Sequence, residues 1–185
     1  MSLTKLDPRS ALVVIDLQKG ILAFPMAHPT TPVLENAARL AKAFRANDLP
    51  VVLVNVAGGA PGRTDEAHGQ LTPPPDWLDI APELDPQPSD IRITKKQWGA
   101  FYGTALDLEL RRRGVTQVVL CGIATSIGVE STARDAYERA YNVGLVVDAM
   151  TDIAAAPHEN SIMRIFPRLG ESATTDAVVA LLQKR

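Results

Sequence analysis

The residues best placed for chemistry are two charged side chains that each follow a short apolar run. Asp16 comes directly after Ala11–Ile15, and Lys95 follows Ile91–Ile93 with one threonine between them. A carboxylate at the end of a buried strand is costly unless it is paired, and a lysine beside it would lower the pKa of the acid and orient it. The pair predicts a general acid or base. The simpler interpretation is a structural acid that caps a turn and, for Lys95 or Lys96, a solvated surface lysine.

The segment Gly122–Gly128 joins another apolar run to an amphipathic stretch and is the best candidate for binding a substrate oxygen. Backbone N–H groups at a helix N-terminus can donate to a carbonyl or carboxylate. The segment matches neither a dinucleotide-binding glycine motif nor a phosphate-binding loop, because its two glycines lie six residues apart. Cys121 precedes it inside the apolar run, and free cysteines are among the most buried residue types. We therefore expect Cys121 in the core rather than as a nucleophile.

Composition and the remaining motifs exclude several classes of function. One cysteine and three scattered histidines offer no metal-ligand spacing, no serine stands in a nucleophile-elbow motif, and no cofactor is expected. The net charge of −2 provides no basic excess for nucleic acid or for an anionic membrane. No run approaches the ~20 apolar residues of a membrane span, and the first ten residues lack the apolar core of a secretion signal. We expect a cytoplasmic protein that binds a small-molecule substrate.

Short runs that are apolar throughout predict parallel strands covered on both faces. A weaker, alternating run at Ile91–Ile93 predicts a strand nearer the edge of the sheet, and a short last strand is expected at Glu171–Thr174. The four apolar runs are Ala11–Ile15, Val51–Val54, Val118–Leu120 and Val143–Val147.

Amphipathic segments alternate with these runs and predict helices with one apolar face each. Strands that alternate with helices predict an α/β fold, an open and mostly parallel sheet of about six strands with helices on both faces. Ligands bind such sheets beyond the carboxyl ends of the strands, which selects residues such as Asp16 and Lys95. The predicted helices are Val33–Phe44, Thr104–Arg113, Gly128–Tyr141, Pro157–Phe166 and Thr175–Gln183.

Residues 57–90 interrupt the alternation of strands and helices. They hold prolines at positions 61, 73, 74, 75, 82, 86 and 88, half of the 14 in the chain. A loop of this length is usually functional or disordered, and Trp77 and Leu78 predict that part of it packs against the fold. No internal repeat or second hydrophobic unit is evident. Residues 1–185 are therefore expected to form a single domain, with the proline-rich loop near its site.

Four segments, in this order and at this spacing, make the chain resemble the isochorismatase-like hydrolase superfamily over nearly its whole length. They are Val14–Gln18, Lys95–Asp107, Cys121–Ala136 and Val147–Met150. The resemblance implies a Rossmann-like, three-layer α/β/α fold and an Asp-Lys-Cys triad. Asp16 matches the acid of that triad and Lys95 matches the lysine, whereas Gly128 stands at the position of the cysteine.

The glycine at position 128 decides which chemistry the resemblance implies. Amidases of this superfamily need the thiolate for a covalent acyl intermediate. True isochorismatases commonly lack the cysteine, often with glycine in its place, and cleave a vinyl ether by general-acid catalysis. The resemblance therefore implies that Asp16 is the acid and that Lys95 positions it and offsets developing charge. Gly128 would leave room for the substrate or for water.

The same resemblance implies further site residues and an assembly state. Family members often have a cis peptide bond at the position of Ile123–Ala124, and they are usually homodimers or higher homo-oligomers. An apolar wall and a group that holds a substrate carboxylate, Gln18 or Arg63, complete the expected site. The residues assigned to substrate binding are Gln18, Phe24, Arg63, Trp98, Phe101, Ile123, Ala124, Thr125 and Ile127.

Three other interpretations stay open at this point. One is an amide or C–N hydrolase in which Asp16 activates water directly, so that ammonia release would survive Cys121→Ala. Another is a non-catalytic family member that binds a small molecule in the retained pocket. The third is a thiol-dependent enzyme that uses Cys121 and would lose activity on treatment with iodoacetamide.

Overall fold

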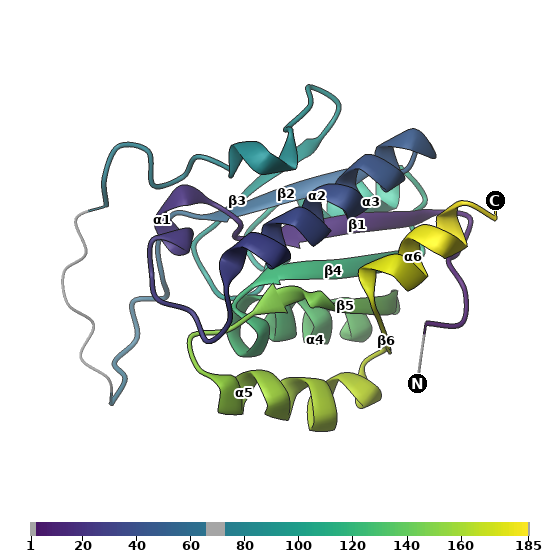
Figure 1. The fold of residues 1–185 in the computed structure, drawn as a ribbon. Coiled ribbons are helices and arrows are strands. Elements are labelled where there is room, and N and C mark those ends of the chain that lie inside the picture. Colours follow the sequence, from purple (N-terminus) through teal and green to yellow (C-terminus); the bar gives the residue numbers. More distant parts are fainter. Residues whose placement is uncertain (1–2, 66–72, 185) are drawn as a thin grey trace.

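The computed structural model describes residues 3–65 and 73–184, and within them six parallel strands form one sheet in the order β3-β2-β1-β4-β5-β6 (Figure 1). This confirms the α/β fold expected from the alternation of apolar runs and amphipathic segments. The alternating run of β3 lies at an edge, as predicted. The strands are β1 Ser10–Ile15, β2 Val51–Val56, β3 Ile91–Lys95, β4 Gln117–Ile123, β5 Asn142–Thr151 and β6 Glu171–Ala173.

Helices cover both faces of the sheet and divide its apolar side chains between two cores. Leu12 and Val14 of β1 face the core that contains α2 and α6, whereas Val13 and Ile15 face the core that contains α3 and α4. This division follows from the period of two along a strand. None of the helices in the described residues is long and apolar enough to cross a membrane. The helices are α1 Lys19–Leu22, α2 Thr30–Ala46, α3 Leu106–Arg112, α4 Glu130–Glu138, α5 Ala155–Asn160 and α6 Thr175–Leu182.

The strand order places a topological switch point between β1 and β4. The chain runs outward from β1 through β2 to β3 and then crosses back, so that β4 pairs with the other side of β1. Ile15 of β1 lies opposite Gly122 of β4 in this pairing. Because ligands of open α/β sheets bind at the carboxyl ends of strands at such a point, the residues after Ile15 and Gly122 face the expected crevice.

Three helical segments differ from the sequence-based expectation. The helix expected from Gly128 is preceded by a π-helical turn, η2 Thr125–Val129, before α4 begins. The segment Pro157–Phe166 divides into α5 and two shorter pieces, η3 Ser161–Ile165 and η4 Phe166–Arg168. The break between η3 and η4 falls next to Pro167, which has no N–H with which to continue a helix. The four-residue helix α1 was not expected, since so short a segment shows no periodicity.

Part of the proline-rich loop packs against the sheet, as Trp77 predicted. The Trp77 indole Nε1 donates to the Val56 carbonyl at 2.9 Å, and a short 3₁₀ helix, η1 Pro82–Leu84, buries Leu84 in the core. Leu78, by contrast, is exposed. Residues 66–72 of the loop lie outside the described part of the chain.

Candidate active site

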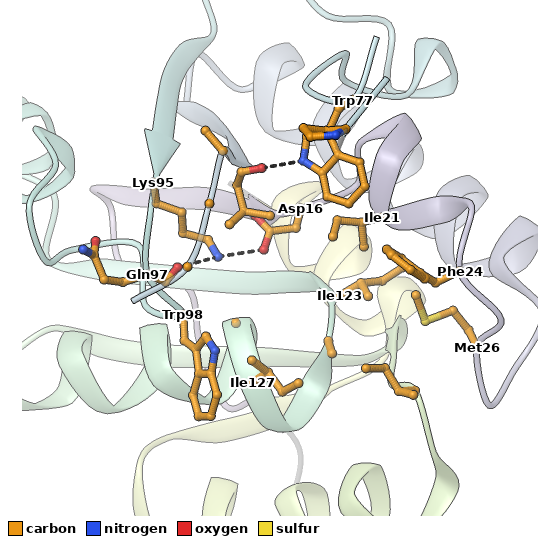
Figure 2. A pocket seen from close by; sticks show the side chains of 18 residues that line it. Asp16, Ile21, Phe24, Met26, Trp77, Lys95, Gln97, Trp98, Ile123 and Ile127 are labelled. Atoms are coloured by element: carbon orange, nitrogen blue, oxygen red, sulfur yellow. Dashed lines mark hydrogen bonds and ion pairs between the residues drawn. The ribbon is translucent and has the colours of Figure 1, made fainter. Parts of the chain in front are cut away.

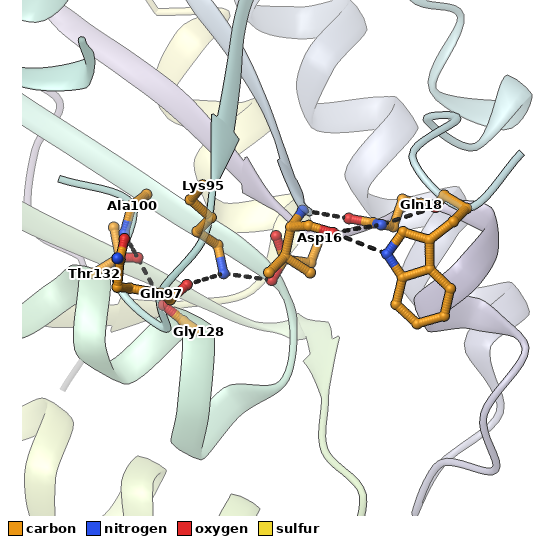
Figure 3. A network of polar contacts seen from close by, with 9 residues as sticks. Asp16, Gln18, Lys95, Gln97, Ala100, Gly128 and Thr132 are labelled. Carbon is orange, nitrogen blue, oxygen red and sulfur yellow. Dashed lines mark hydrogen bonds and ion pairs between the residues drawn. The ribbon is translucent and has the colours of Figure 1, made fainter. Parts of the chain in front are cut away.

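Asp16 and Lys95 meet at the switch point and form a buried ion pair. The Lys95 Nζ donates to Asp16 Oδ2 at 2.7 Å and to the Gln97 carbonyl oxygen at 3.1 Å (Figure 3). Asp16 has a φ of 51°, in the left-handed region that aspartate and asparagine tolerate better than most residues, and this turn ends β1. The fold thus brings together two charges that lie 79 positions apart in the sequence.

The Asp16 carboxyl has one engaged oxygen and one unengaged oxygen. Lys95 occupies Oδ2, whereas Oδ1 is buried and has no hydrogen-bond partner among the described residues. Burial raises the pKa of the Asp16 carboxyl to about 6, and the charge and hydrogen bond of Lys95 oppose this effect without cancelling it. Near neutral pH the carboxyl is therefore able both to hold a proton and to release it.

A cavity of about 560 Å³ opens over this pair, a size typical of small-molecule sites (Figure 2). Its lining includes the two charged residues, and most of the other lining residues are apolar. Eight of the residues assigned from the sequence line it: Asp16, Phe24, Lys95, Trp98, Ile123, Ala124, Ile127 and Gly128.

Gln18 lies elsewhere than we expected from the sequence. Its side chain is fully buried and does not line the cavity. Its Oε1 accepts from the Val56 N–H at 2.6 Å, and its Nε2 donates to the carbonyl oxygens of Val56 and Trp77 at 3.2 Å and 2.8 Å. The amide is thus fully engaged with backbone and joins the end of β1 to β2 and to the Trp77 segment. It has no group left for a substrate carboxylate.

Three more assigned residues also lie outside the cavity lining. Phe101 is buried in the core, and its ring centre lies 5.9 Å from that of Tyr141. Thr125 is buried, and its hydroxyl donates to the Thr151 carbonyl at 3.0 Å. Arg63 is exposed and lies on the loop after β2. A residue that lies close in sequence to a site residue can therefore still point its side chain away from the cavity.

The cavity also contains residues that sequence reasoning missed. Val56, which ends β2, and Ile153, which lies just beyond β5, obey the strand-end rule and could have been selected by it. Trp77 was expected to pack, but not to form a wall of the site. The lining residues on helix α1 and on the turn after it do not follow a strand, so the strand-end rule does not select them. The missed lining residues are Ile21, Met26, Val56, Ala57, Gly58, Gly59, Pro73, Trp77, Gln97 and Ile153.

Gly128 lies directly over the acid. A Cβ placed on Gly128 would stand 3.4 Å from Asp16 Oδ2 and 2.9 Å from Ile15 Cγ2. The Gly128 carbonyl accepts from the Thr132 hydroxyl at 2.7 Å, and that hydroxyl in turn accepts from the Ala100 N–H at 3.1 Å (Figure 3). Helix α4 and the loop after β3 are therefore joined beneath the cavity, and residue 128 is held against Asp16.

The loop that carries Gly128 begins with a cis peptide bond between Ile123 and Ala124, at the position that the resemblance implied. The Ala124 carbonyl accepts from the N–H groups of Ile127 and Val129, both at 3.1 Å. The Ser126 N–H donates to a carboxylate oxygen of Asp152 at 2.6 Å. These contacts fix the loop from behind, so that Ile123, Ala124, Ile127 and Gly128 present their surfaces to the cavity.

The described residues place neither a thiol nor a metal cluster at the cavity. Cys121 is fully buried in β4, as predicted, and does not line the cavity. Burial, together with the charge of Asp148, raises the pKa of its thiol to about 12, so the reactive thiolate is scarce at neutral pH. Within residues 3–65 and 73–184, no three His, Cys, Asp or Glu side chains are grouped so as to hold a metal ion.

Replacing Cys121 by alanine is expected to leave the activity unchanged and to lower the free energy of unfolding by about 1 kcal/mol, because a well-packed sulfur is lost from the core. Native protein should also resist alkylation by iodoacetamide, which mass spectrometry measures directly. Rapid alkylation of the native protein with parallel loss of turnover would instead establish a thiol-dependent enzyme.

Comparison with known proteins agrees with this fold. The Isochorismatase domain model matches residues 10–177. The uncharacterized isochorismatase family protein YwoC of Bacillus subtilis is 46% identical over 175 residues, which cover 91% of each chain. The ureidoacrylate amidohydrolase RutB of Methylobacterium radiotolerans is 35% identical over 176 residues, covering 78% of this chain and 68% of RutB. A solved isochorismatase family protein from Burkholderia thailandensis superposes with a TM-score of 0.93 at 46% identity, covering 98% of this chain and all of that one. The chain therefore belongs to the isochorismatase family of hydrolases.

Proposed function

We propose that this hydrolase cleaves a small molecule of the vinyl-ether type by general-acid catalysis from Asp16, without a covalent intermediate. The observation that carries the proposal is the state of the Asp16 carboxyl. One of its oxygens is held by Lys95, and the other is unpartnered in a group that lines the cavity. Because burial raises the pKa of this carboxyl to about 6, a proton is available for transfer near neutral pH.

The reaction balances with Asp16 and one water. The Asp16 proton is transferred to the terminal vinyl carbon, which leaves an oxocarbenium ion beside a newly ionised carboxylate. Lys95, whose Nζ lies 2.7 Å from Oδ2, stabilises that carboxylate. Water then adds to the cationic carbon and returns a proton to the carboxylate. The resulting hemiketal or hemiacetal collapses to an alcohol and a carbonyl compound.

Gly128 supports the same mechanism because it brings no side chain to the acid. A side chain at position 128 would begin 3.4 Å from Asp16 Oδ2 and 2.9 Å from Ile15 Cγ2. Glycine therefore lets this turn approach Asp16 closely and contributes no nucleophile. The resemblance implies a thiolate here in amidases, so its absence favours a mechanism in which the acid alone carries the reaction.

The pH dependence of turnover tests this proposal. With cyclohexyl vinyl ether, followed by acetaldehyde release, kcat/KM is expected to fall about tenfold for each pH unit above about 6. The reason is that the active form carries the Asp16 proton and is lost as the pH rises through the pKa. Buffer-only hydrolysis is subtracted at each pH, because vinyl ethers are acid-labile. A rate that rises with pH would contradict the proposal.

Lys95→Met is the matched variant for this profile. The Lys95 charge lowers the pKa of Asp16, so its removal should raise that pKa further and move the falling limb of the profile to higher pH. A profile that keeps its position in Lys95→Met would assign the limb to a different group.

A second candidate function is amide hydrolysis, and the 35% identity to the ureidoacrylate amidohydrolase RutB favours it. In that reaction Asp16 would act on water as a base, which requires the ionised carboxylate. The rate would therefore rise with pH through about 6, opposite in sign to the vinyl-ether reaction. Ammonia release from amide and ureido substrates, retained in Cys121→Ala, would identify this alternative.

A homo-oligomer in the cytoplasm is the remaining part of the proposal. Large apolar side chains stand exposed on the surface, among them Tyr102, Tyr137 and Met163. Such residues are more common at subunit interfaces than on the free surface of a monomer, which supports assembly into a homodimer or larger oligomer.

A further inference from the structure

The cavity over Asp16 is walled mainly by large apolar side chains. Phe24, Trp77, Trp98, Ile123, Ile127 and Ile153 all line it. Figure 2 shows Phe24, Trp77, Trp98, Ile123 and Ile127 around the Asp16–Lys95 pair, which supplies the charge of the site. A ligand that fills this volume of about 560 Å³ therefore transfers most of its surface from water to an apolar environment.

The cation that lines the cavity is already engaged. Lys95 is only 2% exposed, and its ammonium group is turned toward Asp16 Oδ2 and the Gln97 carbonyl oxygen. An anionic group on a ligand thus finds no accessible ammonium at the base of the cavity.

No other cation among the described residues lines the cavity. Lys19, on the neighbouring helix α1, is bound to Asp76 and Asp79 at 3.4 Å and 3.1 Å. Arg63 is exposed and does not reach the lining. Residues 66–72, which lie outside the described part, contain neither lysine nor arginine. Among the described residues, the cavity lining therefore offers a carboxylate no guanidinium or ammonium group that is not already paired.

We propose that the cavity binds an uncharged, largely apolar molecule with one polar reactive group, and that it discriminates against carboxylates and other anions. A carboxylate buried here would lose its hydration without gaining an opposite charge, which is among the costliest events in binding. The inference rests on the proposed function only for the reactive group, an enol ether or an amide. The preference for a neutral molecule follows from the cavity itself.

Binding of two unreactive ethers separates this preference from catalysis. Methyl cyclohexyloxyacetate and cyclohexyloxyacetate share a ring and an ether oxygen and differ in the charge of the terminal group. Both tryptophans of the chain line the cavity, so intrinsic fluorescence reports occupancy without a label. The neutral ester is expected to bind at least about tenfold more tightly than the acid at pH 7.5. Equal or tighter binding of the acid would overturn the proposal, as would binding of neither compound.

A charge added at the rim should reverse the preference. Ile153 lines the cavity and is exposed, so Ile153→Arg is tolerated by the fold and places a guanidinium at the opening. This variant is expected to bind the acid about tenfold more tightly than the wild type does. Gln183→Arg adds the same charge at an exposed position outside the lining and is expected to leave both affinities unchanged. A gain of equal size in both variants would show general charge attraction instead and would contradict the proposal.

These measurements also distinguish the two ideas from each other. If the ester binds more tightly than the acid while cyclohexyl vinyl ether is not hydrolysed, the proposed function fails and the preference for neutral ligands holds. If cyclohexyl vinyl ether is hydrolysed but the acid binds as well as the ester, the function holds and the preference fails.

Discussion

Replacing Asp16 by asparagine is expected to lower kcat/KM for vinyl-ether hydrolysis by about 100-fold or more, the usual scale for loss of a general acid. An amide cannot supply the proton that the vinyl carbon must receive. Asparagine has the same shape, accepts a hydrogen bond from Lys95 at the position of Oδ2, and tolerates the φ of 51° at this residue. The effect should therefore appear in catalysis, measured as release of the carbonyl product, more than in folding.

Asp48→Asn is the matched control for this variant. Asp48 also has a positive φ, 54°, but it is exposed and does not line the cavity. It should keep full activity, and circular dichroism and thermal unfolding of both variants would show that the fold is retained. If Asp16→Asn retained more than about a tenth of the wild-type rate, the proton would have to come from another group.

Gly122→Ala is expected to lower the free energy of unfolding by about 4 kcal/mol or more, among the largest effects of any single substitution. Gly122 has a φ of 118°, which L side chains rarely adopt. A Cβ at this residue would stand 2.0 Å from the Ile15 carbonyl oxygen and 2.7 Å from the Ile15 nitrogen, both part of the adjacent β1 backbone. Because β1 is central in the sheet, this backbone cannot move aside. Denaturant unfolding or loss of soluble protein would measure the effect.

Gly62→Ala provides the comparison, since no atom lies within 4 Å of a Cβ placed at Gly62. It is expected to change the free energy of unfolding by less than about 1 kcal/mol. A Gly122→Ala protein as stable as Gly62→Ala would mean that β1 and β4 are not packed as described. The prediction ties stability to function, because the contact that Gly122 permits brings Asp16 and the loop Ile123–Gly128 to the same crevice.

The local sequence pattern predicted most of the strands and helices of the fold. Apolar runs such as Val118–Leu120 predict buried strands because a strand covered on both faces needs apolar side chains at every position. The stripe in Val33–Phe44 predicts α2 because its apolar residues recur with the helical period. These signals fail where the element is too short, as in α1, or where the turn changes type, as in η2. Both elements make hydrogen bonds to residues distant in sequence: the Lys19 N–H donates to the Asp79 carbonyl, and the Ser126 N–H donates to the Asp152 carboxylate.

The site was only partly accessible from sequence. Asp16 and Lys95 were selected because both follow strands, and parallel strands bring their carboxyl ends to one edge. Gln18 and Phe101 were assigned to substrate binding and instead engage the backbone and the core. Whether such a side chain turns inward depends on its neighbours in space. The spacing of residues along the chain says little about these neighbours.

By itself, the sequence determined the α/β class, the strand-end positions of the acid and the lysine, the buried state of Cys121 and the glycine at position 128. These features depend on residue type and on the short-range spacing of apolar residues, and both can be seen in the sequence without the folded structure. The tertiary structure alone decided that Asp16 Oδ1 is unpartnered and that burial outweighs Lys95 in raising the pKa of the acid to about 6. It also decided that, among the described residues, the cavity lining is mainly apolar and offers no accessible cation. These properties depend on desolvation and on distances between groups from β1, β3 and β4, which exist only once the strands have paired.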